Sequence, residues 1–299
     1  MLLTGITCPQ ATAGQPGDVL LARYLSVKDQ LSRSAFQRPV ILESREAEDE
    51  LKGDIYAVMD QPFEKVRQAL QNMDHWCDIL ILHLNVKNCR VVNDAAKQSL
   101  IVSIGKKHDE PLDKAFPVEF SFLVAVATDS DLRIRLHAET GPLGTKNYQI
   151  AFEAVPLDAG KTFIHLAYSY DYGLTARLAM KGYLTTIGSG KVGFSVVEPR
   201  PEGEPVLISG VRAVVERNTM RYYLAVESYL GSLNLPLSEQ LESRLHSWFA
   251  ATEQYRRQLH EMDETEYLEM KHKEVLRQHT GDSHAAQTAP SNEPVKTSR

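Results

Sequence analysis

Residues 210–233, GVRAVVERNTMRYYLAVESYLGSL, carry a long helical pattern. Their apolar positions recur at intervals of three and four residues, which predicts one helix with a wide apolar stripe that ends at Gly231. Such a stripe must be buried against another layer of structure. The stripe consists of Val211, Val214, Val215, Asn218, Tyr222, Ala225, Val226, Tyr229 and Leu230.

The layer that buries this helix is predicted to be a sheet. Strands are expected over 40–44 and 51–60, and the region from about residue 80 to 172 then alternates with period two. Arg133, Arg135 and His137 alternate away from the apolar positions, so one face of this antiparallel sheet should be wet. The inward residues are Phe120, Phe122, Val124, Val126, Leu132, Ile134, Leu136, Ala138, Tyr148, Ile150, Phe152, Ala154, Ile164, Leu166, Tyr168, Tyr170 and Tyr172.

Further helices surround these two elements. Asp18 is a plausible N-cap for an amphipathic helix over 18–34, and Pro62 lies in the first turn of a short helix that a second one follows at 73–79. The segment 174–186, between the sheet and the long helix, is predicted to be helical. Two surface helices are expected after Pro236, with their basic residues on a solvated face because glutamates are interleaved with them. These residues are Arg256, Arg257, Lys271, Lys273 and Arg277.

The expected organisation is one large domain with extensions. Residues 40–235 form the α+β domain, preceded by the leader helix and connector at 18–39 and followed by a helical extension at 236–279 and a disordered tail at 280–299. Residues 1–13 resemble the remnant of a signal peptide, because Ala11-Thr12-Ala13 fits a small-x-small cleavage site. A periplasmic or secreted location is therefore expected, with the cytoplasm as the alternative.

Composition disfavours two classes of partner. The chain has 299 residues, 43% of them hydrophobic and 24% charged, and a net charge of -6. This balance offers no general attraction for nucleic acid. No stretch approaches the roughly 18 to 20 consecutive apolar residues that a membrane-spanning helix needs. We therefore expect a soluble protein that does not bind nucleic acid and does not span a membrane.

The order of elements resembles that of the START and polyketide-cyclase (SRPBCC) superfamily, which has the helix-grip fold. The stretch GDIYAVMDQPFEKVRQALQNMDHWCDI, 53–79, is similar to that family's first strand and paired helices, and 210–233 is similar to its closing helix. The resemblance covers roughly residues 50–232. It implies a curved antiparallel sheet wrapped around the last helix, with a tunnel for an apolar ligand. The resemblance implies no catalytic residues for this sequence. The C-terminal helices are an addition to the family's minimal order of elements.

The stretch HWCDILILHLNVKNC, 75–89, holds two of the three cysteines. A metal site would use His75, Cys77, His83 and Cys89, but zinc sites favour short-spaced ligand pairs. A nucleophilic Cys77 would need a partner that lowers its pKa, and no paired motif supplies one. A disulfide between Cys77 and Cys89 is the preferred interpretation if the chain is exported, with two buried thiols as the alternative.

The aromatic stripe of the sheet is the candidate ligand site. Core packing is the default for such a stripe, yet several phenols on one inner face suit a cavity with water or ligand. No cofactor is expected, because IGSGKVG, 187–193, fails as a phosphate-binding loop: Thr185 replaces the first glycine and Val192 follows Lys191. The candidate ligand-binding residues are Phe120, Phe122, Tyr148, Phe152, Tyr168, Tyr170, Asn218 and Tyr222.

Three functions are compatible with these observations. The first is a carrier or sensor of a hydrophobic small molecule or lipid, without catalysis. The second is a cyclase- or hydrolase-like enzyme that uses the same tunnel, with a tyrosine, His165 or Asp171 in acid/base roles. The third is an interaction protein whose tunnel is filled by its own side chains.

Overall fold

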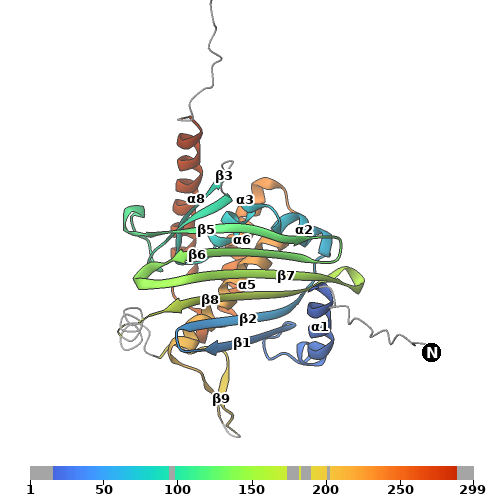
Figure 1. The fold of residues 1–299 in the computed structure, drawn as a ribbon. Helices are drawn as coiled ribbons and strands as arrows, with labels where there is room; N and C mark the ends of the chain where they lie inside the picture. The colour runs from blue at the N-terminus through green and yellow to red at the C-terminus, as the bar shows by residue number, and fades with distance from the viewer. Residues whose placement is uncertain (1–15, 94–97, 174–181, 183–189, 201–202, 288–299) are drawn as a thin grey trace, which may run out of the picture.

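The computed structural model describes residues 16–93, 98–173, 182, 190–200 and 203–287. Its centre is an eight-stranded, fully antiparallel sheet with the order β1-β2-β8-β7-β6-β5-β4-β3 (Figure 1). The strands are β1 (Val40–Glu46), β2 (Glu50–Met59), β3 (Val86–Asn93), β4 (Gln98–Ile104), β5 (Phe116–Ala127), β6 (Leu132–Thr140), β7 (Thr145–Leu157) and β8 (Lys161–Tyr172). A small separate ribbon pairs β9 (Val196–Glu198) with β10 (Val206–Leu207).

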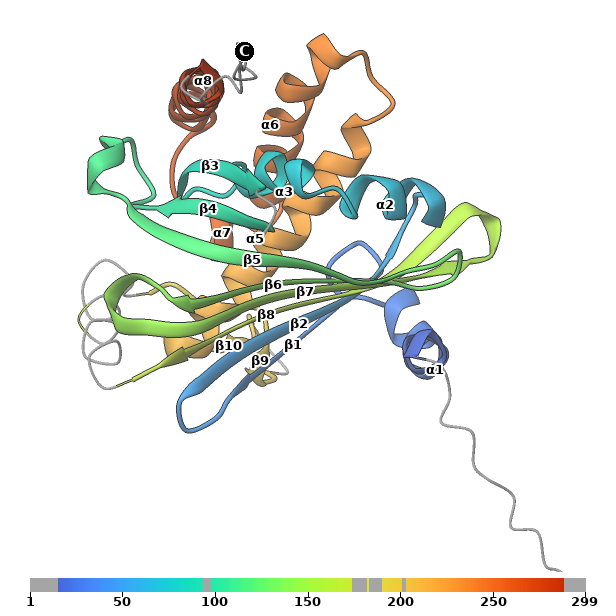
Figure 2. The ribbon, with the colours of Figure 1, turned by 45° about the horizontal axis from the view of Figure 1, so that its top comes forward.

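Two short helices, α2 (Phe63–Leu70) and α3 (Met73–Leu80), connect β2 to β3 at the far end of the sheet order. The chain then returns strand by strand until β8 pairs with β2, with Ile55 opposite Leu166. The long helix α5 (Gly210–Ser232) packs on the concave face, against β1, β2 and β8. Figure 2 shows this arrangement edge-on. The expected α+β helix-grip fold is confirmed.

Helix α5 is buried on nearly all sides rather than along one stripe. Val215 and Ala225 of the expected stripe are fully buried, but the charged residues Glu216, Arg217 and Arg221 are also buried, at most 2% exposed. The sheet covers one side of the helix and the C-terminal helices cover the other, so charged residues outside the apolar stripe are enclosed too. The predicted stop at Gly231 is wrong by one residue, because the helix continues through Ser232 with Leu233 as a right-handed C-cap.

The outer face of the sheet is not entirely wet. Helix α1 (Pro16–Ser32) packs there against β7, β8 and β1 (Figure 2). Its residues Leu20 and Val27 form a second apolar cluster with Phe163, which is fully buried. The helix begins two residues before the expected cap, so Asp18 lies in the first turn, where a carboxylate stabilises the helix dipole.

The C-terminal extension consists of α6 (Leu237–Glu253), α7 (Arg256–Leu259) and α8 (Glu264–Gln287). Helix α8 is described through Gln287, so its last turns fall within the segment expected as a tail from residue 280. Lys271 contradicts the expected solvated face. It is fully buried and, together with Lys87, pairs with Glu274 at Nζ–O distances of 2.7 and 3.0 Å.

Cys77 in α3 and Cys89 in β3 form the expected disulfide, with 5.2 Å between their Cα atoms. His75 and His83 are directed elsewhere: His75 Nδ1 lies 2.7 Å from the Ala69 carbonyl oxygen, and His83 Nδ1 accepts from the Asn85 amide. Within the described ranges no group of three His, Cys, Asp or Glu side chains could hold a metal ion.

None of the helices in the described part of the chain is both long and apolar enough to span a membrane. The expected signal-like segment at 1–13 and nearly all of the helix expected over 174–186 lie outside the described residues.

The buried ion pairs of Glu274 with Lys87 and Lys271 should contribute strongly to the free energy of unfolding. Replacing Glu274 by Ala leaves the Lys87 and Lys271 ammonium groups buried without their carboxylate, which should lower the free energy of unfolding by about 3–5 kcal/mol. Urea denaturation of the variant measures this loss. Glu269→Ala, at an exposed position of the same helix, is the control and should change little. Equal stability of both variants would contradict the assigned role of Glu274.

Candidate ligand-binding cavity

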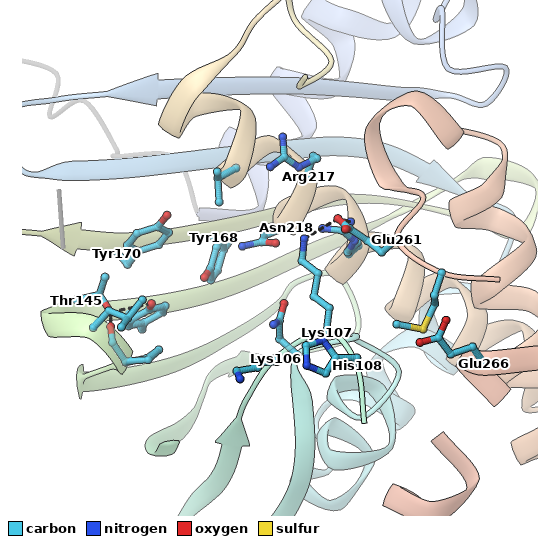
Figure 3. Close-up of a pocket in the computed structure, with 17 residues that line it drawn as sticks. Lys106, Lys107, His108, Thr145, Tyr168, Tyr170, Arg217, Asn218, Glu261 and Glu266 are labelled. Atoms are coloured by element: carbon cyan, nitrogen blue, oxygen red, sulfur yellow. Dashed lines mark hydrogen bonds and ion pairs between the residues drawn. The ribbon is translucent and has the colours of Figure 1, made fainter. Parts of the chain in front are cut away.

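A cavity of about 570 Å³ lies between the concave face of the sheet at β7 and β8, helix α5, and two connections. These are the β4–β5 loop and the link from α7 to α8. Aromatic side chains form one side and charged side chains the other (Figure 3). The lining comprises Asn85, Lys106, Lys107, His108, Pro142, Leu143, Thr145, Tyr148, Tyr168, Tyr170, Val214, Arg217, Asn218, Arg221, Glu261, Met262 and Glu266.

The aromatic side is built by an irregularity in β7. The pairing of β7 with β8 shifts register between Lys146 and Gln149, so that Asn147 and Tyr148 together lie opposite Tyr170. Such a bulge re-aims a side chain that regular pairing would place differently. Tyr148 stacks on Tyr170, with ring centroids 5.1 Å apart, and Tyr168 lies 5.6 Å from Tyr170. The three rings form a continuous wall.

Two tyrosines of this wall have polar neighbours. The Thr145 hydroxyl donates to the Pro142 carbonyl, and the Tyr148 hydroxyl lies 2.9 Å from the Thr145 oxygen. The Asn218 side chain lies beside Tyr168 (Figure 3) and offsets part of the rise that burial causes in the pKa of its phenol. Burial raises the pKa of Tyr148, Tyr168 and Tyr170, so all three phenols stay neutral at physiological pH. They can orient a ligand by hydrogen bonds but do not serve as bases.

Lys107 reaches the opposite side from the β4–β5 loop (Figure 3). Asn85 fixes that loop, because its carbonyl accepts from the Gly105 amide and its side chain donates to the Gly105 carbonyl. A Cβ at position 105 would meet the Glu110 carboxylate at 1.8 Å and the Lys87 side chain at 2.9 Å, so any larger residue would require these side chains to move. The Lys107 ammonium then lies 2.6 Å from Glu261. Burial lowers the pKa of Lys107 to about 8, with Arg221 contributing in the same direction.

Arg217 and Arg221 reach the cavity from successive turns of α5. Arg217 donates to the Val192 carbonyl at 3.1 Å, and Arg221 donates to the Leu259 carbonyl and to Glu261 at 3.1 and 2.9 Å. Burial raises the pKa of Glu261, but the cations Arg221, Lys107 and Lys191 outweigh this effect and lower it below its usual value. Glu261 is therefore an anion at physiological pH.

The eight residues proposed from the sequence divide into two groups. Tyr148, Tyr168, Tyr170 and Asn218 line the cavity. The other four are not among the lining residues. The Tyr222 ring lies against the Tyr168 ring, with centroids 5.1 Å apart, and against the His83 ring, with centroids 4.9 Å apart. The remaining three are core residues in the described structure, where Trp76 of α3 packs near Phe122 and Phe152. These three are Phe120, Phe122 and Phe152.

The acid/base residues suggested for an enzyme lie on the wrong face of the sheet. His165 and Asp171 alternate with the cavity residues Tyr168 and Tyr170 along β8, so they belong to the outer face. His165 bridges Asp54 and Glu153 at 2.8 and 3.0 Å. That part of the enzyme hypothesis is wrong, because the period of a strand separates these side chains from the cavity.

Sequence reasoning missed the charged side of the cavity. Arg217 and Arg221 did carry a signal, since they lie four residues apart, and therefore on one side of the helix, close to Asn218. Lys106, Lys107 and Glu261 lie in connections without periodicity, and no local pattern could have placed them together.

No protein-family model and no curated protein matches this sequence. Among solved structures, the chain is similar to a conserved protein from Geobacillus kaustophilus, at 11% identity over 60% of this chain and 95% of that one, with a TM-score of 0.36. It is also similar to Ara h 8.0201, at 13% identity over 61% and 99% of the two chains and a TM-score of 0.35. A third similar structure is human StAR-related lipid transfer protein 5, at 12% identity over 57% of this chain and 88% of that one, with a TM-score of 0.31. Similarity at this level identifies neither a ligand nor an activity for this chain.

His165 predicts how stability depends on pH. Burial lowers its pKa, but the hydrogen bonds to Asp54 and Glu153 outweigh burial, so its pKa is raised above the ordinary value of about 6.5. The charged imidazolium therefore stabilises the fold fully below about pH 6.5, and this contribution is lost as pH rises through the raised pKa.

Chemical denaturation of the wild type and of His165→Gln over a pH series measures this contribution. The variant should lose more stability at pH 6 than at pH 9. A loss that does not change over this range would contradict the charged bridge.

Proposed function

We propose that this chain binds a hydrophobic small molecule or lipid in the cavity between β7, β8 and α5, and carries or senses it without transforming it. The observation that supports this most is the cavity itself. Its volume of about 570 Å³ lies within the range of about 300–1,000 Å³ that is usual for small-molecule sites. The tyrosine wall offers a broad aromatic surface to an apolar body, as such sites require.

The proposed driving force is the removal of apolar surface from water. Burying about 400 Å² of ligand surface, at about 25 cal/mol per Å², gives a gross gain near 10 kcal/mol before the costs of association. Asn218 and the neutral phenols of Tyr148 and Tyr168 orient the ligand in this account. They add specificity because a ligand without matching polar groups would leave them unsatisfied.

We also propose that the protein works outside the cytoplasm, in the periplasm or as a secreted protein. The Cys77–Cys89 disulfide supports this location, since disulfides persist in oxidising compartments and are rare in the cytosol.

An enzyme in the same cavity is the second candidate, and Lys107 is the observation that favours it. An amine with a pKa lowered to about 8 can exchange protons near neutral pH, and it lies in the cavity beside Glu261. Mass spectrometry of a bound ligand before and after prolonged incubation separates the two functions. A carrier returns its ligand unchanged.

Partly filling the cavity should weaken binding without harming the fold. Val214 lines the cavity from α5, and Val214→Trp would place an indole where the ligand lies. A loss of about 60 Å² of ligand burial, at about 25 cal/mol per Å², weakens binding at least about tenfold. Titration with the neutral dye Nile red measures the Kd, and thermal denaturation monitors the fold.

Leu276→Trp is the matched control, because Leu276 is 66% exposed on α8. It should bind the dye as the wild type does. Undiminished binding by a folded Val214→Trp variant would refute this cavity as the site.

A further inference from the structure

The charged side of the cavity has an excess of positive charge. Among the residues that the structure describes, its lining holds four lysine and arginine side chains, one histidine and two carboxylates. Lys191 adds a further ammonium 3.3 Å from Glu261. The whole chain, by contrast, has a net charge of -6, so this excess is local. The charged lining residues are Lys106, Lys107, Arg217, Arg221, Glu261 and Glu266.

Three of these cations converge on one carboxylate. Lys107 and Arg221 lie 2.6 and 2.9 Å from one oxygen of Glu261, and Lys191 approaches the other. Arg217 and Arg221 are 2% and 1% exposed, so solvent screens their charges only weakly. Their guanidinium groups also donate to the uncharged carbonyl groups of Val192 and Leu259. Among the residues that the structure describes, Glu261 thus shares its negative charge among three cations.

The other carboxylate of the lining does not restore the balance. Glu266 lies in the first turn of α8, where its side chain is exposed to solvent and lies apart from Glu261 (Figure 3). The neutral tyrosine wall contributes no negative charge, because burial raises the pKa of each phenol. The interior end of the cavity is thus cationic on one side and aromatic on the other.

We propose that this cationic side receives the head group of the ligand, and that the ligand is an amphipathic oxyanion, a carboxylate or a phosphate ester with an apolar body. This inference rests on the proposed function and specifies its ligand class. The head group lies against Lys107, Arg217 and Arg221, and the apolar body lies along the tyrosine wall. Guanidinium groups suit this task because their planar donors match the oxygens of a carboxylate or a phosphate.

A series of ligands with one alkyl chain and different head groups tests the proposal. A saturated fatty acid, the monoalkyl phosphate and the primary alcohol of the same chain length compete with Nile red for the full chain. The fatty acid, the phosphate or both should bind at least about tenfold more tightly than the alcohol, and added salt should reduce this preference. The tighter of the two anions identifies the head group. Equal binding of the alcohol and both anions would overturn the proposal.

Two variants with opposite expected effects assign the preference to named residues. Lys107→Gln should lower the affinity for the preferred anion about tenfold and leave that for the alcohol unchanged. Glu261→Gln should raise the affinity for the anion, because it removes the negative charge that competes with the ligand. Lys114→Gln changes the charge equally at an exposed lysine outside the cavity and should have no effect.

The outcomes separate this inference from the proposed function. If none of the three ligands and no dye binds, the proposed function fails, and the head-group assignment fails with it. If all three ligands bind with equal affinity, the cavity is a hydrophobic site and only the head-group assignment is wrong. If Lys107→Gln weakens the anion and the alcohol equally, Lys107 has a structural role, which also contradicts the assignment. Should Glu261→Gln fail to fold, the Lys107→Gln comparison still decides.

Discussion

The structure depends on the complete enclosure of α5. A helix whose apolar stripe includes the fully buried Val215 and Ala225 also carries Glu216, Arg217 and Arg221 into the interior. Buried charges are tolerated only where hydrogen bonds and opposite charges compensate them. Each of these three charged residues consequently forms hydrogen bonds with a segment outside α5.

These segments define the cavity. Glu216 accepts from the Phe194 and Ser195 amides and from the Ser44 hydroxyl, which joins the connection before α5 to β1. Arg221 pairs with Glu261, and its carbonyl accepts from Trp248 of α6. The C-terminal extension is therefore part of the domain's interior. It closes the cavity on the side that faces away from the sheet.

The concave face is filled at one end and open at the other. Trp76 of α3 packs near Phe122 and Phe152 at one end. At the other end, the bulge at Asn147 and Tyr148 places the Tyr148 ring in a stack with that of Tyr170, and the Tyr168 ring is tilted against both. Local pairing of two strands thus shapes the aromatic wall of the cavity.

Much of the fold could be predicted because its information is periodic. The alternation in β5 to β8 and the stripe of α5 each repeat over many residues, so single exceptions do not hide them. The disulfide followed from two cysteines at the ends of one apolar stretch.

The site was predicted only in part, because its information is not periodic. Tyr148, Tyr168, Tyr170 and Asn218 lie on regular elements and could be found. The pairing of Lys107 with Glu261 joins residues 154 positions apart in two irregular connections, which only the folded chain brings together. Burial of Lys271 was missed for a related reason: a lysine in a charged helix is usually solvated, and the His83 and Val86 carbonyl groups that accept from its ammonium lie in a distant segment of the chain.

The central claim is that the space between the sheet and α5 holds a hydrophobic molecule. Native mass spectrometry of the full chain, purified without detergent from the cells that produce it, tests this claim most directly. We expect a species heavier than the chain by the mass of one small molecule, which organic extraction releases. A protein that carries no added mass, and whose mass stays unchanged when hydrophobic molecules are supplied in excess, would contradict it.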